Sequence, residues 1–340
     1  MKQGGSPTLR PSHVDDRRFR RCGRSRRRNQ TLNPNPNPQR FPICTRLLRT
    51  AAAVLALLST AAPSVHAQTA AAASTPAAAA SESAASHALA HAETLRRTHL
   101  VRLQEHIEKP EEDLHRTCRF ESDIATLPPE GVVALTFDDG PEPGHTEAIL
   151  AVLARHQVPA TFFLIAEKAK LHPDLVAQMR ALPGAVIGNH SWSHPNFHDI
   201  PVDEQRKEVD SADTLLHADL GTTPLFRYPY GNSSCDTNER VHTMGYHIVG
   251  WHVDSCDWAF DGPNGLTAGE ALSCGVLPVY RRDFLGHIVS SVRAHRGGVV
   301  LMHETQHISV DNLDALIVRL EGEGYRFSTP AAAEFETSLR

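Results

Sequence analysis

The sequence lacks a strongly hydrophobic run of transmembrane length. Its apolar run at residues 51–58 is much shorter than the ~20 apolar residues that a membrane-spanning helix needs. Arg46 and Arg49 precede this run, and the small-residue pattern Val65-His66-Ala67 follows it. A basic region, a short apolar core and a small-residue cleavage site together form an export signal. We therefore predict cleavage after Ala67, export to the periplasm or the cell exterior, and no stable transmembrane span in the mature protein.

Residues 1–43 lack any apolar period and are rich in Arg, Asn and Pro, so we do not expect them to pack. The basic stretch Arg17–Arg28 resembles a nucleic-acid-binding arm if it is considered alone. The export signal that follows favours another interpretation, in which this lead is an extended n-region or lies upstream of the true start. We assign residues 1–67 to a basic lead and export signal peptide.

The mature chain lacks the excess of basic residues that nucleic-acid binding requires. Residues 1–67 carry 13 Lys and Arg and 2 Asp and Glu, so their removal takes the formal net charge from −5 to −16. Like charge opposes encounter with nucleic acid and with other acidic polymers. We predict a neutral substrate and no nucleic-acid partner.

Residues 68–125 lack the pattern of an independent core. Gln68–Ala85 is an Ala/Ser/Thr tract, which is typical of a flexible tether. Between residues 88 and 107 apolar residues recur at near-helical spacing, and Pro110 ends the pattern, which predicts a packing helix. We assign residues 68–125 to an Ala-rich tether and packing helix, and residues 126–334 to the main domain.

From Gly131 onward the chain alternates short apolar runs with helical patterns. This alternation is typical of an α/β domain with a mainly parallel sheet or barrel. The predicted strands are residues 131–137, 160–166, 185–189, 225–228, 247–253, 298–303 and 326–328. In such folds the active site lies at the carboxyl ends of the strands. Polar motifs at those ends are therefore the first candidates for chemistry.

Two carboxylates, Asp138 and Asp139, end the first predicted strand and meet the turn signal Gly140-Pro141. Adjacent strand residues point to opposite faces, so the two carboxylates share a site only if the backbone turns there. Considered alone, a solvated Asp-Asp-Gly turn is the simpler interpretation. Polar groups at the ends of later strands favour function instead.

His190 and His194 directly follow the third predicted strand. Two His at i and i+4 can present both imidazoles on one side of a helical turn, as metal binding requires. The same spacing occurs in three other pairs, which makes it weak evidence alone: His87/His91, His194/His198 and His303/His307. The strand-end position distinguishes His190/His194. Two His and one Asp leave open metal positions, which suits catalytic zinc and also non-haem iron.

Three further strand ends carry polar residues. Arg227 ends the fourth strand and can hold a carboxylate bidentately. The fifth strand leads into residues 254–258, which include two Asp, and the sixth ends at His303 and Glu304. A His beside a carboxylate is a common proton donor near neutral pH. Each residue alone has a structural explanation, but five polar motifs at successive strand ends favour one active site.

Together these motifs resemble the carbohydrate esterase family 4 polysaccharide deacetylases, also called the NodB homology domain. They span about residues 131–330 in the family's order: Thr-Phe-Asp-Asp-Gly, His-Ser-Trp-Ser-His, Arg-Tyr-Pro-Tyr, Asp-Ser-Cys-Asp-Trp and Leu-Met-His. The resemblance implies a distorted (β/α) barrel of about seven parallel strands, with the active site at the C-terminal strand ends. It also implies a hydrolase that removes acetyl groups from N-acetylhexosamine residues of a polysaccharide, such as peptidoglycan, a chitin-like polymer or an exopolysaccharide.

The resemblance also implies how the metal and the base are held. Asp139, His190 and His194 would hold a divalent metal, most often zinc, with cobalt, nickel or manganese as alternatives. Asp138 would be the general base, and Arg227 would orient it. These roles suit the chemistry, since a metal activates water and a carboxylate takes the proton.

The remaining implied roles concern the acid and the acetyl group. His303 would be the general acid, tuned by Asp257, because an amine is a poor leaving group unless it is protonated. The backbone N–H of Tyr230 would help to hold the oxyanion, and Trp258 and Leu301 would line the slot for the acetyl methyl group.

Two departures from the family's pattern affect the substrate. Glu304 follows the acid His where Asp is common, and residues 259–281 form a Gly/Pro-rich insertion that is expected to reshape the groove. An acetyl-xylan type O-deacetylase needs the same constellation, whereas a carbohydrate-binding pseudoenzyme is expected to lose Asp138 or His303. A non-haem iron oxygenase shares the metal ligands but needs neither proton-transfer pair. The oligomeric state is left open.

Removal of the signal leaves four cysteines, an even number in a chain sent to an oxidising compartment. Three connectivities are possible. We favour a Cys235–Cys256 bridge, because both residues follow the ends of consecutive strands, and a Cys118–Cys274 bridge as the second choice. Small buried thiols are the alternative.

Overall fold

The computed structural model describes residues 118–260 and 265–340, together with residues 94, 97–98, 100–101 and 104. All of these belong to the second of two compact units, Met1–Ala70 and Ala71–Arg340. The predicted export signal, the tether and most of the predicted packing helix lie outside the described residues. The few described residues within that predicted helix are helical. None of the helices that the structure describes is both long enough and apolar enough to span a membrane.

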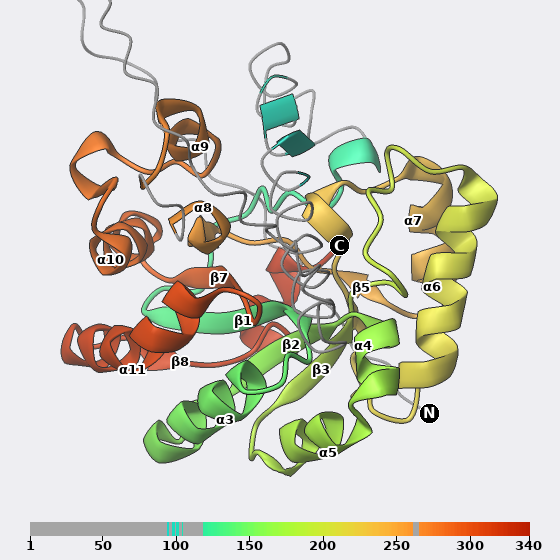
Figure 1. The fold of residues 1–340 in the computed structure, drawn as a ribbon, viewed down its shortest axis with the longest axis horizontal. Helices are drawn as coiled ribbons and strands as arrows, with labels where there is room; N and C mark the ends of the chain where they lie inside the picture. Colours follow the sequence, from blue (N-terminus) through green and yellow to red (C-terminus); the bar gives the residue numbers. More distant parts are fainter. Residues whose placement is uncertain (1–93, 95–96, 99, 102–103, 105–117, 261–264) are drawn as a thin grey trace, which may run out of the picture. The chain divides into compact units, whose positions relative to one another are not determined.

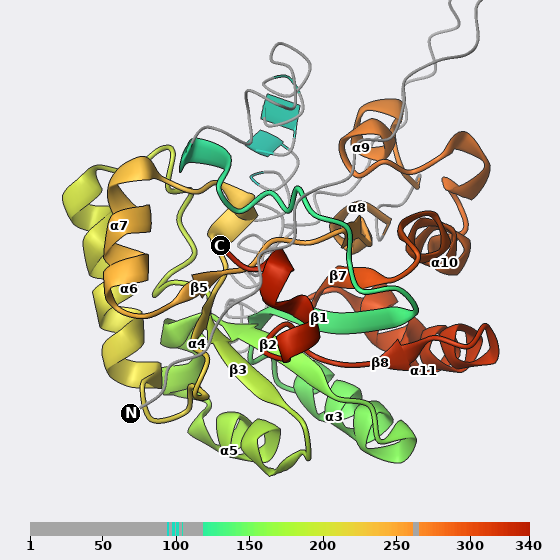
Figure 2. The same ribbon diagram turned by 180° about the vertical axis from the view of Figure 1, so that it is seen from behind.

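The centre of the fold is a parallel sheet with the strand order β5-β4-β3-β2-β1-β7-β6, and β8 pairs with the start of β1. The sheet curls into a barrel with helices around it (Figures 1 and 2). The barrel is open, because among the described residues no ladder joins β5 to β6. This arrangement confirms the predicted distorted (β/α) barrel. The strands are β1 (Val132–Gly140), β2 (Ala160–Leu164), β3 (Val186–Asn189), β4 (Leu225–Phe226), β5 (His247–Ile248), β6 (Val253–Asp254), β7 (Gly298–His303) and β8 (Arg326–Phe327).

Helices alternate with most of the strands. Over residues 118–260 and 265–340 the α-helices are α3 (His145–His156), α4 (Ala166–Leu171), α5 (Pro173–Ala181), α6 (Val202–Leu216), α7 (Cys235–Thr243), α8 (Asp257–Phe260), α9 (Ala268–Ser273), α10 (Phe284–His295) and α11 (His307–Gly322). The part of the chain that the structure describes also contains four short 3₁₀ turns: η1 (Cys118–Phe120), η2 (Pro229–Gly231), η3 (Pro278–Tyr280) and η4 (Ala333–Ser338). The long helices return the chain to the amino end of the sheet, so successive parallel strands end at the same edge.

Strand β1 is buried along its whole length and presents two faces to the core. Leu135 and Phe137 belong to the main hydrophobic cluster, whereas Val132 and Ala134 belong to a separate one. Because side chains alternate along a strand, Asp138 continues the face of Val132 and Ala134. The carboxylate therefore lies on the side of β1 away from the main cluster.

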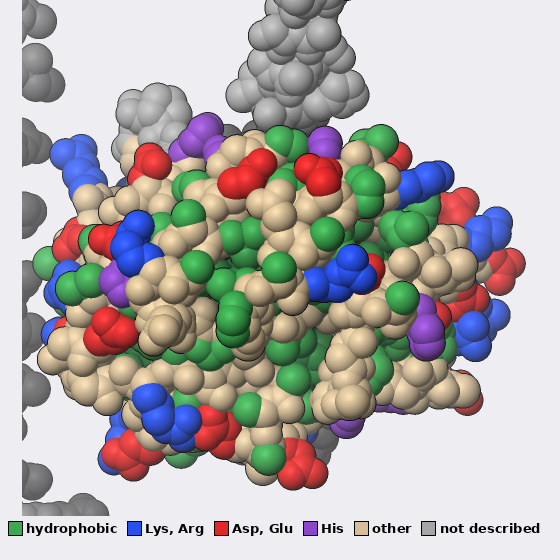
Figure 3. Space-filling view, turned by 90° about the horizontal axis from the view of Figure 1, so that it is seen from below, with side chains coloured by type: hydrophobic (Ala, Val, Ile, Leu, Met, Phe, Trp, Pro, Cys, Tyr) green, Lys and Arg blue, Asp and Glu red, His purple; other side chains and the backbone are tan. Residues whose placement is uncertain are grey.

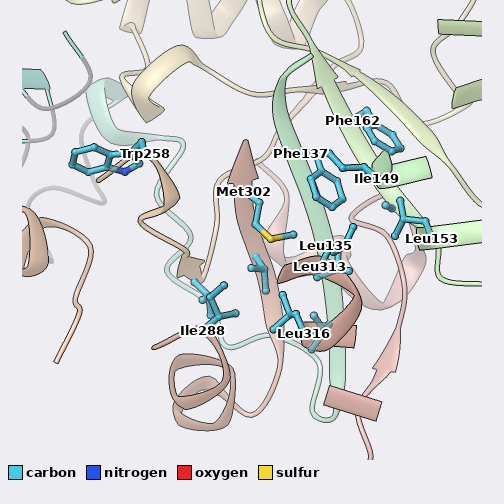
Figure 4. Packing of buried hydrophobic residues seen from close by; sticks show 14 of the residues in the cluster. Leu135, Phe137, Ile149, Leu153, Phe162, Trp258, Ile288, Met302, Leu313 and Leu316 are labelled. Atoms are coloured by element: carbon cyan, nitrogen blue, oxygen red, sulfur yellow. The ribbon is translucent and has the colours of Figure 1, made fainter. Parts of the chain in front are cut away.

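Figure 4 shows the main cluster around β1. Ile149 and Leu153, one turn apart on α3, share this cluster with Leu135 and Phe137. Phe137 and Phe162 stack with their ring centroids 5.5 Å apart. Burial of a side chain of this size contributes about 1.5–3 kcal/mol to the free energy of unfolding. Later elements contribute the other labelled members: Trp258, Ile288, Met302, Leu313 and Leu316.

The predicted strand at residues 247–253 is wrong as a single element, because the chain forms two short strands, β5 and β6, at opposite edges of the sheet. Between them, the carbonyls of Val249 and Gly250 accept hydrogen bonds from the Arg227 side chain at 3.2 and 2.9 Å. A Cβ on Gly250 would lie 1.8 Å from the carbonyl oxygen of Ser122. The carbonyls of both residues therefore bond to the Arg227 side chain, and Gly250 packs against the loop that contains Ser122.

Two disulfides, Cys118–Cys235 and Cys256–Cys274, join the four cysteines beyond residue 67. Both pairings predicted from the sequence are wrong. The prediction placed the loops after the fourth and fifth strands next to each other. In the structure Cys256 follows β6, which pairs with β7, whereas Cys235 follows β4, which pairs with β3 and β5. Because residues 247–253 contribute to two strands at opposite edges of the sheet, Cys256 lies at the edge away from Cys235.

The face drawn in Figure 3 carries acidic and basic side chains interspersed with hydrophobic and neutral ones. Neither sign of charge forms a continuous patch on this face. Binding to a nucleic-acid backbone relies on clustered Lys and Arg, which this face does not present. That no nucleic acid is a partner stays a prediction.

Candidate active site

The predicted catalytic and metal-binding residues come from several strand ends that lie far apart in the sequence. The structure brings most of them together in one pocket. Its lining consists of Asp138, His190, His194, Tyr228, Tyr230, Gly231, Trp251, Leu301 and His303. The pocket lies at the carboxyl ends of β1, β3, β4 and β7, as expected for a parallel sheet.

Asp138 and Asp139 share one site because the backbone turns between them. Asp139 has a φ of 71°, and the pairing of β1 with β2 is irregular between Asp138 and Gly140. Asp138 Oδ2 and Asp139 Oδ1 lie 3.6 and 3.5 Å from His190 Nε2. In a regular strand these two side chains would point to opposite faces. The turn that the sequence predicts here therefore brings both carboxylates to the same imidazole.

Asp139, His190 and His194 form a buried cluster whose ligand atoms lie within 4.8 Å of one another, the one such group found among the described residues. Asp139 Oδ1 is 3.2 Å from His194 Nε2. His190 Nδ1 donates to the carbonyl of Arg227 at 2.8 Å, which leaves its Nε2 lone pair on the side of Asp139. Two imidazoles, of which His190 has its tautomer fixed by this bond, and one carboxylate fit a divalent metal such as zinc.

The loop that carries the two His differs from the predicted helical turn. Ser191 and His194 have φ values of 71° and 64°, so the segment is not helical. The Ser191 hydroxyl accepts from the backbone N–H of His194 at 3.0 Å. Glu208 on α6 accepts from the backbone N–H of Trp192 at 2.9 Å. The loop is thus held by side chains, and the sequence offers no local signal for the role of Glu208.

Arg227 is completely buried and forms an ion pair with Asp138. Its Nη1 donates to Asp138 Oδ1 at 2.7 Å and to the Thr136 hydroxyl at 2.8 Å. The predicted bidentate contact is therefore wrong, because the other guanidinium N–H groups donate to the carbonyls of Val249 and Gly250. Burial lowers the pKa of Arg227, and the charge of Asp138 opposes this effect. The bonds to Thr136, Val249 and Gly250 fix the plane of the guanidinium, and Nη1 then holds one oxygen of the Asp138 carboxylate in place.

His303 and Asp257 form a second buried pair. His303 Nδ1 donates to Asp257 Oδ1 at 2.7 Å, and the Ser309 hydroxyl donates to Asp257 Oδ2 at 2.5 Å. Burial by itself would lower the pKa of His303. The charge and hydrogen bond of Asp257, together with the charges of Asp139 and Asp138, outweigh burial and raise this pKa to about 10. His303 is therefore held in its protonated form at neutral pH.

The apolar part of the pocket agrees only partly with the sequence analysis. Leu301 and Tyr230 line the pocket as predicted, and Tyr230 has a φ of 60°. Trp258 is not among the lining residues and packs in the main hydrophobic cluster (Figure 4). Trp251 and Tyr228, which sequence reasoning did not single out, line the pocket instead. The sequence signal that could have found them was their position in predicted strands, 225–228 for Tyr228 and 247–253 for Trp251.

Glu304, the first departure from the family pattern, is buried beside the turn at Asp138. Its backbone N–H donates to the carbonyl of Asp138 at 2.9 Å, and the Thr146 hydroxyl donates to its carboxylate. A Cβ on Gly140 would overlap this carboxylate, so the glycine makes room for the longer side chain. Burial raises the pKa of Glu304 to about 8.

The structure describes residues 259–260 and 265–281 of the second departure, residues 259–281. Helix α9 begins with a capping box formed by Thr267 and Glu270. The Cys256–Cys274 disulfide ties this segment to the residue that precedes Asp257. The insertion is therefore anchored directly beside the His303–Asp257 pair.

Comparison with known proteins gives three agreeing results. Residues 125–249 match the family model described as polysaccharide deacetylase. A peptidoglycan-N-acetylglucosamine deacetylase of Bacillus cereus is 36% identical over 211 residues, which are 61% of this chain and 69% of that protein. The peptidoglycan-N-acetylmuramic acid deacetylase PdaA of Bacillus subtilis is 30% identical over 213 residues, 62% of this chain and 74% of that protein.

A solved structure agrees with the sequence relatives. It is a peptidoglycan N-acetylglucosamine deacetylase in complex with 4-naphthalen-1-yl-N-oxidanyl-benzamide, with a TM-score of 0.50 and 32% identity. The match covers 60% of this chain and 89% of that structure. The B. cereus relative exceeds 30% identity over more than two thirds of its length, and its family is the one implied by the five strand-end motifs. The chain belongs to the polysaccharide deacetylase family.

Proposed function

We propose that the chain is a metal-dependent hydrolase that removes acetyl groups from N-acetylhexosamine residues of a polysaccharide. The observation that carries this proposal is the meeting, in one pocket, of the Asp139/His190/His194 cluster with a base and an acid that each have a buried partner. Hydrolysis of an amide needs an activated water, an oxyanion site and a proton for the leaving amine. The pocket contains a candidate group for each of these tasks.

Asp139, His190 and His194 are the residues that would hold the metal, and we propose zinc. A divalent metal in this position would polarise the acetyl carbonyl and lower the pKa of water. Cobalt, nickel and manganese are the alternative ions, because all of them accept imidazole and carboxylate ligands.

Asp138 is the proposed general base. Its Oδ1 is held by Arg227 at 2.7 Å, and its Oδ2 lies 3.6 Å from Nε2 of His190, one of the residues that would hold the metal. The arrangement leaves Oδ2 to accept the proton of the attacking water.

His303 is the proposed general acid and Tyr230 the proposed oxyanion donor. Asp257 keeps His303 protonated and fixes the ring, so that Nε2 can give its proton to the departing amine. The backbone N–H of Tyr230 would donate to the oxyanion, and Leu301 with Trp251 would contact the acetyl methyl group.

We propose further that residues 126–334 form the deacetylase domain and that residues 1–67 direct its export. Polysaccharides of the cell envelope lie outside the cytoplasm, so an exported enzyme would meet them. The names of the relatives favour peptidoglycan as the polymer, and chitin-like and exopolysaccharide substrates remain candidates.

Asp257→Asn should move the alkaline limb of the pH–rate profile to lower pH. A general acid works only while it is protonated, so activity falls as the pH rises through the pKa of His303. Loss of the Asp257 charge lowers that pKa, and we expect the limb in kcat/KM to shift by roughly 1–3 pH units. Asp314→Asn on α11, which removes an exposed carboxylate, is the control. An unchanged alkaline limb in a folded Asp257→Asn enzyme would contradict the assignment of His303 as the acid.

Acetate release from a panel of acetylated glycans tests the proposed function. The zinc-loaded protein should release acetate from N-acetylglucosamine oligomers or peptidoglycan fragments, and far less from acetylated xylan. Release from xylan alone would favour an O-deacetylase. Binding to glycans without release from any of them would favour a carbohydrate-binding pseudoenzyme.

A further inference from the structure

Residues 118–123, which we call the N-terminal clasp, precede the region that matches the family model and lie outside the predicted deacetylase domain. The clasp begins with the turn η1, which lies beside α7 in Figures 1 and 2. Phe120 and Ser122 are buried, with exposed fractions of 0 and 2%. The Cys118–Cys235 disulfide joins the clasp covalently to the first residue of α7. The clasp is therefore part of the folded core and is not a free leader.

The clasp bonds directly to the loop that follows Tyr230. The Ser122 hydroxyl donates to the carbonyl of Gly231 at 2.5 Å, and the Ser233 hydroxyl donates to the carbonyl of Cys118 at 3.0 Å. Asn238 Nδ2 also donates to the carbonyl of Cys118, at 2.6 Å. All of these groups come from buried residues or from the disulfide itself, so water competes weakly for them.

The same contacts reach two residues that line the pocket. Gly231 is one of them, and its backbone N–H donates to the carbonyl of Tyr228 at 2.9 Å. Tyr228 is the other, and its hydroxyl donates to Asn238 Oδ1 at 2.8 Å. Gly231 is thus held at its N–H by Tyr228, and its carbonyl accepts from the Ser122 hydroxyl at 2.5 Å and from the backbone N–H of Ser233 at 3.2 Å. The residue that directly follows Tyr230 has little freedom to move.

Tyr230 itself has a backbone conformation that needs such support. Its φ of 60° and ψ of 7° lie in the left-handed region, which a non-glycine residue adopts at a cost of about 1–3 kcal/mol. A strained conformation of this kind persists only where neighbouring contacts fix it. Ser122 supplies one of those contacts from a segment more than 100 residues away in the chain.

We propose that Ser122 is a positioning residue for catalysis, whose hydroxyl fixes the Gly231 carbonyl and thereby the Tyr230 backbone N–H that holds the oxyanion. The inference rests on the proposed function of Tyr230. Ser122 touches neither the proposed metal ligands nor the acid and base. Its effect is expected in the transition state, where the oxyanion exists, and not in substrate binding.

Ser122→Ala tests this role. With N-acetylglucosamine oligomers as substrate, we expect kcat per zinc-loaded chain to fall about tenfold, with KM changed less than twofold. The loss is smaller than the 10²–10³-fold typical of removing an oxyanion donor outright, because the donor stays and is only displaced. Zinc content should equal that of the wild type. Ser122→Thr keeps the hydroxyl and should restore most of kcat.

Thr126→Ala is the matched control, because the Thr126 hydroxyl also donates to a distant backbone carbonyl, that of Thr337 at 2.9 Å, but lies away from the pocket. It should keep wild-type kcat even if its melting temperature falls. With an active wild type, three results would each overturn the inference. The first is a wild-type kcat in Ser122→Ala, the second is a loss of kcat in Thr126→Ala equal to that in Ser122→Ala, and the third is no recovery of kcat in a folded Ser122→Thr. No acetate release by the zinc-loaded wild type would overturn the proposed function, and the inference with it.

Discussion

Asp138→Asn is expected to lower kcat for acetate release by ~10²–10⁴ and to leave the metal bound, since general base catalysis typically contributes this factor. An amide cannot take the proton of the attacking water, whereas the ligand cluster consists of Asp139, His190 and His194 and does not include Asp138. Turnover of N-acetylglucosamine oligomers and zinc content should be measured on the same preparation. Near-normal turnover would show that another group takes the proton.

The same substitution should also lower stability, because it removes the negative partner of a buried Arg227. Loss of one member of a buried ion pair typically costs about 3–5 kcal/mol in the free energy of unfolding, and the Asn oxygen can recover part of this as an acceptor. Asp210→Asn is the control, since Asp210 forms an exposed pair with Arg240 at 2.9 Å. The control should change stability by less than about 1 kcal/mol and should leave kcat unchanged.

His194→Ala is expected to abolish metal binding and activity together. It removes one of three protein ligands, so the loss of metal affinity should exceed the ~10–100-fold that follows loss of an outer partner. Elemental analysis after dialysis against zinc-free buffer gives the metal content, and acetate release gives the activity. Full zinc occupancy in His194→Ala would remove this residue from the ligand set.

His198→Ala provides a control for metal content, because His198 follows His194 at the same four-residue spacing. His198 Nε2 hydrogen-bonds the carbonyl of Ser233 at 2.9 Å and lies outside the ligand cluster. We expect wild-type zinc content in this variant. Zinc loss in both variants would indicate that the loop, and not the ligand, determines metal binding.

The site could be predicted from the sequence because its residues sit where each strand stops. Asp138, His190, Arg227 and His303 each follow or end an apolar run, and a parallel sheet gathers such positions at one edge. This rule needs only the type and order of the elements and not the order of strands in the sheet. The turn signal at Gly140 was also local, and the positive φ at Asp139 agrees with it.

Features that depend on neighbours in space could not be predicted. The chain reads as one strand over residues 247–253, and only the carbonyl acceptors taken by Arg227 show why it breaks. That break moves β6 beside β7 and so decides the disulfide partners. The side chains of Ser122 and Glu208 hydrogen-bond to backbone groups 109 and 16 residues away in the chain. No residue pattern in the sequence marks such contacts. Trp258 was expected at the pocket on resemblance, but the strand break places Trp251 there.

Acetate release from N-acetylglucosamine oligomers across one cycle of zinc removal and return tests the central claim most directly. The wild-type chain should release acetate when loaded with zinc, lose this activity as a chelator brings its zinc content to background, and regain it when zinc alone is restored. Undiminished release from chain shown to be free of metal would contradict the account.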